Sequence, residues 1–124
     1  MEINELTKRI IGCAIEVHKA LGPGLLESAY EEGLCHELAL QKIPFERQVE
    51  LPVAYKGVHL SAGYRIDLLV DNSVVIEIKA VETLLAVHDA QVLTYLRLGH
   101  WHVGLLINCN VTKLVNGVHL SYLG

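Results

Sequence analysis

The sequence of 124 residues has few aromatic side chains, no long apolar run and none of the usual features of a targeting segment. Aromatic residues make up 6% of it and hydrophobic residues 52%, so its core must be built mainly from Leu, Val, Ile and Ala. The longest apolar runs have the length of a strand, well below the roughly 20 residues that span a membrane. Residues 1–6 lack the basic and apolar regions of a signal peptide. We therefore expect one domain, residues 1–124, located in the cytoplasm and not attached to a membrane.

Positive charge is also scarce. Ten Lys and Arg residues stand against 14 Asp and Glu residues, which gives a formal net charge of −4. A protein that binds nucleic acid normally neutralises phosphates with a basic surface, and this sequence contains no basic run or evident basic patch. Binding of a nucleic acid would therefore need a metal ion, a local basic patch or a partner.

The three cysteines form no recognisable framework. Cys13, Cys35 and Cys109 are odd in number and widely spaced, and no C-x-x-C motif occurs. The pattern argues against a set of disulfides or a zinc ribbon. It favours reduced thiols in the core of a cytosolic protein.

Apolar residues at helical spacing predict three helices, over about Leu6–Leu21, Leu25–Gln41 and Leu84–Leu98. The Gly22-Pro23-Gly24 segment should end the first helix sharply, and Gly99 should end the third. The side chains of the second helix that we expect to point inward are Leu26, Ala29, Tyr30, Leu34 and Leu38.

Alternating apolar residues predict a strand over Arg47–Tyr55, and Pro52 marks it as an edge or bulged strand. The Lys56-Gly57 pair would form the turn into a second strand, Val58–Ala62. A later strand, His102–Asn108, follows a helix that itself follows a strand, so it can lie parallel to an earlier strand.

The chain should close with a hairpin that turns at Asn116-Gly117. The order of elements is then α-α-β-β-β-α-β plus this closing hairpin. Such an order indicates an α/β domain with a mixed sheet covered by helices.

Residues 64–81 are the most informative stretch. If the polar triplet 71–73 forms the loop between two strands, one face of the hairpin is fully apolar and consists of Ile66, Leu68, Val70, Val74, Ile76 and Ile78. On the other face Asp67 lies directly opposite Glu77, and Lys79 follows two residues later. Two opposed carboxylates repel each other unless positive charge lies between them.

A divalent cation together with Lys79 is the simplest physical reason for such a face. Mg²⁺ prefers carboxylate oxygens, and an ion held by Asp67 and Glu77 could polarise a phosphoryl oxygen. Lys79 could stabilise charge that develops on the phosphate. The alternative is a solvated outer face, on which Glu and Lys two residues apart are ordinary. The apolar neighbours of Glu77 favour a central strand, where polar residues are costly to bury without a purpose.

The combination of Asp67, a short hairpin and Glu77-Ile78-Lys79 resembles the PD-(D/E)xK nuclease superfamily. Gly24-Leu-Leu-Glu27-Ser-Ala-Tyr30 also fits a G-x-x-E-x-x-Y motif, and His88-Asp-Ala-Gln91-Val-Leu-Thr-Tyr95 follows the hairpin. From about Leu6 to its end, the chain resembles the bacterial and archaeal GxxExxY protein family. The resemblance implies a restriction-endonuclease-like fold, with a mixed central sheet flanked by helices.

The resemblance also implies roles for individual residues. Asp67 and Glu77 would be metal ligands for Mg²⁺ or Mn²⁺, and Glu27 would add a third carboxylate from the helix that precedes the sheet. Lys79 would be the catalytic lysine. Gln91 would match the helical glutamine that often follows the Glu-x-Lys strand. The proline that precedes the first acid in the superfamily is absent here, since Arg65-Ile66 precedes Asp67.

Three further residues are candidates to face a substrate. Tyr30 lies one turn after Glu27 and would either orient that carboxylate or simply pack. His88 and Tyr95 share a helix face with Gln91, although a glutamine on a helix is usually a surface residue. Glu27 itself, in the first turn of a helix, would without the motif be interpreted as a capping residue.

The sequence therefore predicts a metal-dependent nuclease that hydrolyses phosphodiester bonds in DNA or RNA. Two alternatives remain. A non-catalytic binding or scaffold module could retain the fold and act as a homodimer or through a partner protein, which the acidic net charge favours. A phosphoesterase for small nucleotides would need no basic groove.

Overall fold

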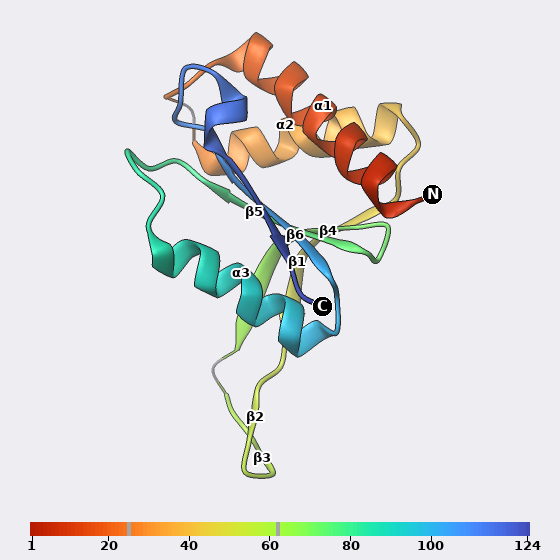
Figure 1. The fold of residues 1–124 in the computed structure, drawn as a ribbon, viewed down its shortest axis with the longest axis vertical. Helices are drawn as coiled ribbons and strands as arrows, with labels where there is room; N and C mark the ends of the chain where they lie inside the picture. The colour runs from red at the N-terminus through yellow and green to blue at the C-terminus, as the bar shows by residue number, and fades with distance from the viewer. Residues whose placement is uncertain (25, 62) are drawn as a thin grey trace.

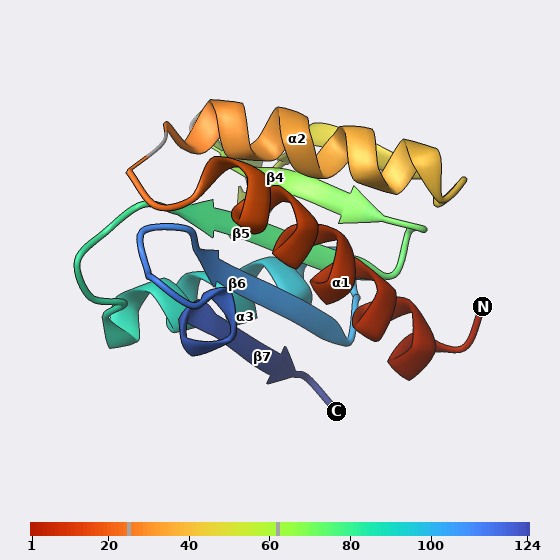
Figure 2. The same ribbon diagram turned by 90° about the horizontal axis from the view of Figure 1, so that it is seen from above.

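The computed structural model describes residues 1–24, 26–61 and 63–124. In this part of the chain, five strands form one mixed sheet in the order β1-β4-β5-β6-β7. These strands are β1 (Phe45–Leu51), β4 (Tyr64–Val70), β5 (Val74–Lys79), β6 (Val103–Asn108) and β7 (Val118–Tyr122). Helices α1 (Ile3–Leu21) and α2 (Glu27–Leu40) cover one face of the sheet, and α3 (Ala86–Gly99) covers the other (Figures 1 and 2). The predicted α/β class is confirmed.

Helix α1 is defined at both ends by its sequence. The Glu2 side chain accepts hydrogen bonds from the N–H groups of Asn4 and Glu5, two of the donors that a helix leaves free at its start. Gly22 ends the helix with φ 68°, a left-handed value that favours glycine, and its N–H donates to the carbonyl oxygen of His18. The buried apolar stripe between these ends contains Leu6, Ile10, Cys13, Ala14 and Val17.

Helix α2 begins at Glu27. The predicted start of this helix, Leu25, lies outside the described residues. Tyr30, Leu34 and Leu38 are buried as expected. Leu26 is not, because 75% of it is exposed. The prediction failed there because Leu26 is the N-cap, with an extended backbone, and so lies outside the helical face.

Each face of the sheet packs its own apolar core. Side chains from α1 and α2 pack on the face that carries Leu68, Val74 and Ile76. Val92, Tyr95 and Leu96 of α3 pack on the other face. All three cysteines are buried and free of disulfides, as the sequence predicts.

The centre of the sheet combines both kinds of pairing. β4 and β5 form the expected antiparallel hairpin, and β6 lies parallel to β5 after the crossover through α3. The parallel strand predicted after the third helix is therefore confirmed. Both faces of β5 and β6 are covered, which explains their almost continuous apolar sequence.

The predicted strand over Arg47–Tyr55 is two strands, because the pairing of β1 ends at Leu51, just before Pro52. After the break, β2 (Ala54–Tyr55) pairs only with β3 (Val58–His59), in a separate hairpin that projects from the end of the sheet (Figure 1). We call residues 52–61 the arm. Its tip is the expected Lys56-Gly57 turn, with φ of 48° and 78°. β3 ends at His59, and Ala62, the predicted end of that strand, lies outside the described residues.

Two predictions for the end of the chain were wrong. Helix α3 includes Gly99, and the left-handed residue that ends it is His100, with φ 60°. No closing hairpin forms at Asn116-Gly117 in the described residues. Instead Leu114–Gly117 is a 3-10 helix, η1, and β7 pairs antiparallel with β6.

Close packing explains the arrangement at Gly117. A Cβ atom at this position would lie 2.5 Å from the carbonyl oxygen of Asn108, so only glycine lets η1 approach the end of β6. Across residues 1–24, 26–61 and 63–124, no helix has the combination of length and apolar composition that a bilayer crossing requires.

Candidate active site

The candidate site lies where strands β4 and β5 separate. Their ladder runs from the Val70–Val74 pair to the Leu68–Ile76 pair, in the register predicted from the sequence. Beyond this pair, hydrogen bonds between backbone N–H groups and side-chain carboxylates replace the backbone–backbone bonds. The N–H of Asp67 donates to Glu77 Oε1 over 2.9 Å, and the N–H of Ile78 donates to Asp67 Oδ2 over 2.8 Å. The two carboxylates therefore bridge the strands at the point where they part.

Where the strands separate, the side chains of β4 no longer alternate regularly between the two faces of the sheet. Ile66 was expected to share an apolar face with Leu68, and it does not. It packs in the α3-side core with Leu69 and Val75. The strict alternation of side chains is therefore broken at Asp67, because a backbone held by side-chain hydrogen bonds no longer follows the regular pleat.

Glu77 is only 4% exposed. Burial raises the pKa of its carboxyl to about 8, and the nearby charge of Asp67 adds to the shift. The hydrogen bond from the Asp67 amide and the charge of Lys79 lower this pKa, but by less. Burial also raises the pKa of Asp67. Near neutral pH this environment favours a protonated Glu77, and positive charge brought to the pair would favour its ionised form.

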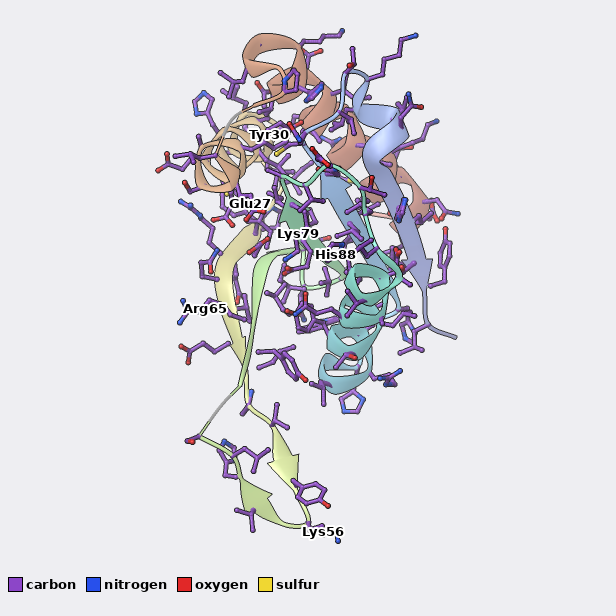
Figure 3. The ribbon with its side chains drawn as sticks, turned by 90° about the vertical axis from the view of Figure 1, so that its left-hand side faces the viewer. Glu27, Tyr30, Lys56, Arg65, Lys79 and His88 are labelled. Carbon is purple, nitrogen blue, oxygen red and sulfur yellow. The ribbon has the colours of Figure 1, made fainter. Side chains whose placement is uncertain are left out.

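Lys79 and Glu27 come from two different elements and lie near each other (Figure 3), and the charges of both act on the acid pair. Lys79 is half-buried at the end of β5. Glu27 is the first residue of α2, and its Oε1 accepts the N–H of Ala80 over 2.9 Å, which fastens the start of α2 to the end of β5. Glu27 and Asp67 also line one small cavity of about 180 Å³. The structure thus places Glu27, Asp67, Glu77 and Lys79 in one region.

These carboxylates do not form a finished three-ligand metal centre. Across the described ranges, no three His, Cys, Asp or Glu side chains are gathered so that they could hold a metal ion. Glu27, Asp67 and Glu77, the predicted ligands, each have one oxygen bound to a backbone N–H. Asp67 and Glu77 are linked across the strands by two of these hydrogen bonds.

Three residues that the sequence analysis missed support the Asp67 side of the site. Glu31 is 5% exposed, and its Oε2 accepts from Arg47 Nε and Nη2 at 3.0 and 2.8 Å. Its Oε1 accepts from Gln48 Nε2 at 2.9 Å. Glu31, Gln48 and Asp67 line the same small cavity. The spacing of Glu31 one turn after Glu27 was an available signal.

Gln48 also explains why the sheet opens here. Its φ is 51°, a left-handed value that is uncommon for this residue type. In the register of β1 with β4, Arg47 pairs with Leu68 and Val49 with Ile66, and Gln48 faces Asp67 between them without a ladder pair. Asp67 is therefore released from regular pairing on both of its sides.

We expect Arg47→Ala to lower the free energy of unfolding by about 1–3 kcal/mol, because the change strips a buried carboxylate of two charged hydrogen bonds. The matched control is Arg65→Ala. The Arg65–Glu50 pair spans 3.4 Å between side chains that are 60% and 79% exposed, so its loss should cost less than about 1 kcal/mol. Urea denaturation of both variants measures the difference. Equal losses would show that Glu31 does not depend on Arg47.

Two of the remaining predicted residues have structural roles. Tyr30 is completely buried, and its hydroxyl donates to the carbonyl oxygen of Ala14 over 2.9 Å. It packs α2 against α1 and leaves no surface with which to face a substrate. His88 caps α3, since its Nδ1 accepts the N–H of Leu85 over 3.0 Å.

Tyr95 lies close to the acids. It is 3% exposed and packs in the α3-side core with Ile66 and Val75. Burial raises the pKa of Tyr95, and the negative charges of Glu77 and Asp67 raise it further. Gln91 lies half-buried one turn before it on α3. The structure therefore brings Tyr95, and not Tyr30, to the acid pair.

The fold and this acid–acid–lysine set define a class: small α/β domains that carry two acids and a lysine where two central strands separate. The chain belongs to the PD-(D/E)XK nuclease superfamily, whose family model matches residues 4–119. Membership supports a nuclease-like function, and nucleases of this superfamily generally use divalent metal ions. No curated protein and no solved structure matches the chain.

Proposed function

We propose that the chain is a metal-dependent nuclease of the GxxExxY group, which hydrolyses phosphodiester bonds in DNA or RNA at Asp67, Glu77 and Lys79. One observation carries the proposal. Asp67 and Glu77 are held together across separating strands, each by a backbone N–H of the other strand, with a lysine two residues further along β5. A purely structural role would not require two acids at one level of a buried hairpin.

The residues at this place fit a hard divalent cation. Oxygen donors suit Mg²⁺ or Mn²⁺, and Mg²⁺ is commonly held by one or two carboxylates and several waters. Asp67 and Glu77 would hold the ion, and Glu27 would contribute from the start of α2. The ion would supply positive charge to a phosphoryl oxygen and to the two buried acids.

The residues of the chain itself would position the reaction. Asp67 and Glu77 are fixed by backbone hydrogen bonds, so their carboxylates need little reorganisation. Lys79 would orient a water and stabilise charge that develops on the phosphate. The water oxygen forms a bond to phosphorus, the ester P–O bond breaks, and the leaving oxygen takes up a proton while the attacking water loses one to solvent.

Assays on the purified protein test the proposal. DNA and RNA, single- and double-stranded, are incubated with Mg²⁺ or Mn²⁺ and with chelator, and Mn²⁺ is titrated by calorimetry. We expect cleavage only with metal, and Asp67→Asn should weaken Mn²⁺ binding at least about tenfold. Asp71→Asn, in the turn of the same hairpin, is the matched control and should bind as the wild type does. Absence of both cleavage and metal binding would overturn the proposal.

Measurements on the same purified protein test the two alternative functions, a homodimeric binding module and a small-nucleotide phosphoesterase. Exposed apolar side chains on the arm, Tyr55 at 58% and Val58 at 60%, favour a homodimeric binding module. Light scattering that finds only monomer counts against it. Small nucleotides assayed beside the polynucleotides distinguish a phosphoesterase from a nuclease.

A further inference from the structure

A larger cavity, of about 790 Å³, lies at the base of the arm. Its wall includes Leu51, Pro52, His59, Leu60, Tyr64 and Arg65. We call it the arm cavity. Its volume is within the range of small-molecule sites and is ample for one nucleoside unit. It is a separate space from the small cavity beside Asp67 and Glu27.

Tyr64 lines the arm cavity and lies on the strand that carries Asp67. It opens strand β4 three residues before Asp67, and 39% of it is exposed. Its ring meets the ring of Tyr95 edge to face, with centroids 5.6 Å apart and planes at 65°. Tyr95 in turn packs in the α3-side core with Ile66 and Val75. One side of the Tyr64 ring is therefore fixed by a buried neighbour, and the ring also forms part of the cavity wall.

The charges around the cavity nearly cancel. Arg65 is paired with Glu50 over 3.4 Å, and both side chains are largely exposed, so a phosphate could displace the carboxylate at little cost. Lys56 lies at the tip of the arm, 5.4 Å from the centroid of the Tyr55 ring. In Figure 3, Lys79, Arg65 and Lys56 follow one another from the acid site down to the arm. A few spaced cations and an exposed aromatic ring suit a single strand better than a duplex.

We propose that the arm cavity binds one unstacked base of a single-stranded polynucleotide against Tyr64, beside the phosphate that is cut at Asp67, Glu77 and Lys79. The inference rests on the proposed nuclease function and specifies which part of the substrate the protein binds. Stacking supplies most of the binding energy, since the local charge is close to zero. The affinity should therefore depend weakly on salt, with a slope of log K against log salt of about −1.

The test compares an oligothymidylate with an abasic strand of the same length, measured by fluorescence anisotropy with Ca²⁺ in place of Mg²⁺ to limit cleavage. Wild type should bind the strand with bases about tenfold more tightly. Tyr64→Leu, which keeps an apolar contact with Tyr95, should bind both strands equally. Tyr64→Phe should retain the wild-type preference and so shows that the ring is responsible. Tyr122→Leu, on the distant strand β7 and 61% exposed, is the matched control and should also retain it.

The outcomes distinguish base binding in the arm cavity from the proposed nuclease function. If Tyr64→Leu still prefers the strand with bases as strongly as wild type does, the arm cavity is not the base site, whether or not the protein cleaves the strand. If wild type binds and cleaves no polynucleotide, the proposed function fails and this inference fails with it. A homodimer in light scattering that Tyr64→Leu dissociates would assign the cavity to a second copy of the chain and overturn the inference.

Discussion

Replacing Lys79 with alanine is expected to slow phosphodiester hydrolysis about 100- to 1,000-fold and to leave the fold intact. The charge of the Lys79 ammonium group acts on Asp67 and Glu77 and offsets part of the rise in the pKa of both carboxyls. Yet in the described part of the chain no carboxylate lies within 4.0 Å of it in an ion pair. Lys79 is therefore not neutralised by a structural partner, and its charge remains available to a phosphate in the transition state.

Single-turnover cleavage with saturating Mn²⁺ measures this effect apart from product release. Lys113→Ala removes an exposed lysine outside the predicted site residues and should cleave at the wild-type rate. Lys79→Arg keeps the charge on a larger planar group and should recover part of the lost rate. Thermal unfolding of each variant shows whether it is folded. Wild-type cleavage by a folded Lys79→Ala protein would remove Lys79 from the mechanism.

The sequence was sufficient to find the acid pair because the hairpin has a rigid geometry. With a polar triplet as the loop, the alternation of apolar residues allowed one register, and the Leu68–Ile76 pair has that register in the structure. The opposition of Asp67 and Glu77 followed directly. Their hydrogen bonds to backbone N–H groups did not follow, because periodicity assumes regular pairing and contains no information about where two strands part.

The features that periodicity missed share a physical origin. Gln48 adopts a left-handed conformation that its residue type does not signal, and a buried partner, Glu31, is what its side chain binds. Leu26 was expected to be buried because its spacing fits the helix, but the helix starts one residue later. Gly117 allows a close approach to Asn108, which is a tertiary contact. Local propensity cannot anticipate positions that are set by such long-range contacts.

The metal-free protein is expected to lose stability as the pH rises from about 4.5 to about 8, and Glu77→Gln should remove this loss. Burial and the charge of Asp67 raise the pKa of Glu77 to about 8 in the folded state, from an ordinary value of 4.5. The folded state therefore binds this proton more tightly than the unfolded state does. The resulting stabilisation is complete below pH 4.5 and is lost as the pH rises through about 8, on the order of 5 kcal/mol in all.

Urea denaturation with chelator, at about pH 5 and about pH 9, measures the difference between wild type and Glu77→Gln. Wild type should lose more stability than the variant between these two values. Glu46→Gln replaces an exposed carboxylate on β1 and should follow the wild type at both. Parallel curves for wild type and Glu77→Gln would show that the Glu77 carboxyl is not held protonated by its surroundings.

Adding Mg²⁺ or Mn²⁺ then distinguishes a metal site from a merely buried acid. A cation that binds the ionised carboxylates stabilises the folded state by mass action, and binding improves as protons leave the ligands. Wild type should therefore recover its stability at high pH when the ion is added, whereas the ion should add little stability to Glu77→Gln or Asp67→Asn. A buried acid without a metal role would keep its pH dependence whatever ion is present. Recovery that needs both carboxylates would show that the energetic cost of opposing Asp67 to Glu77 is offset by the cation.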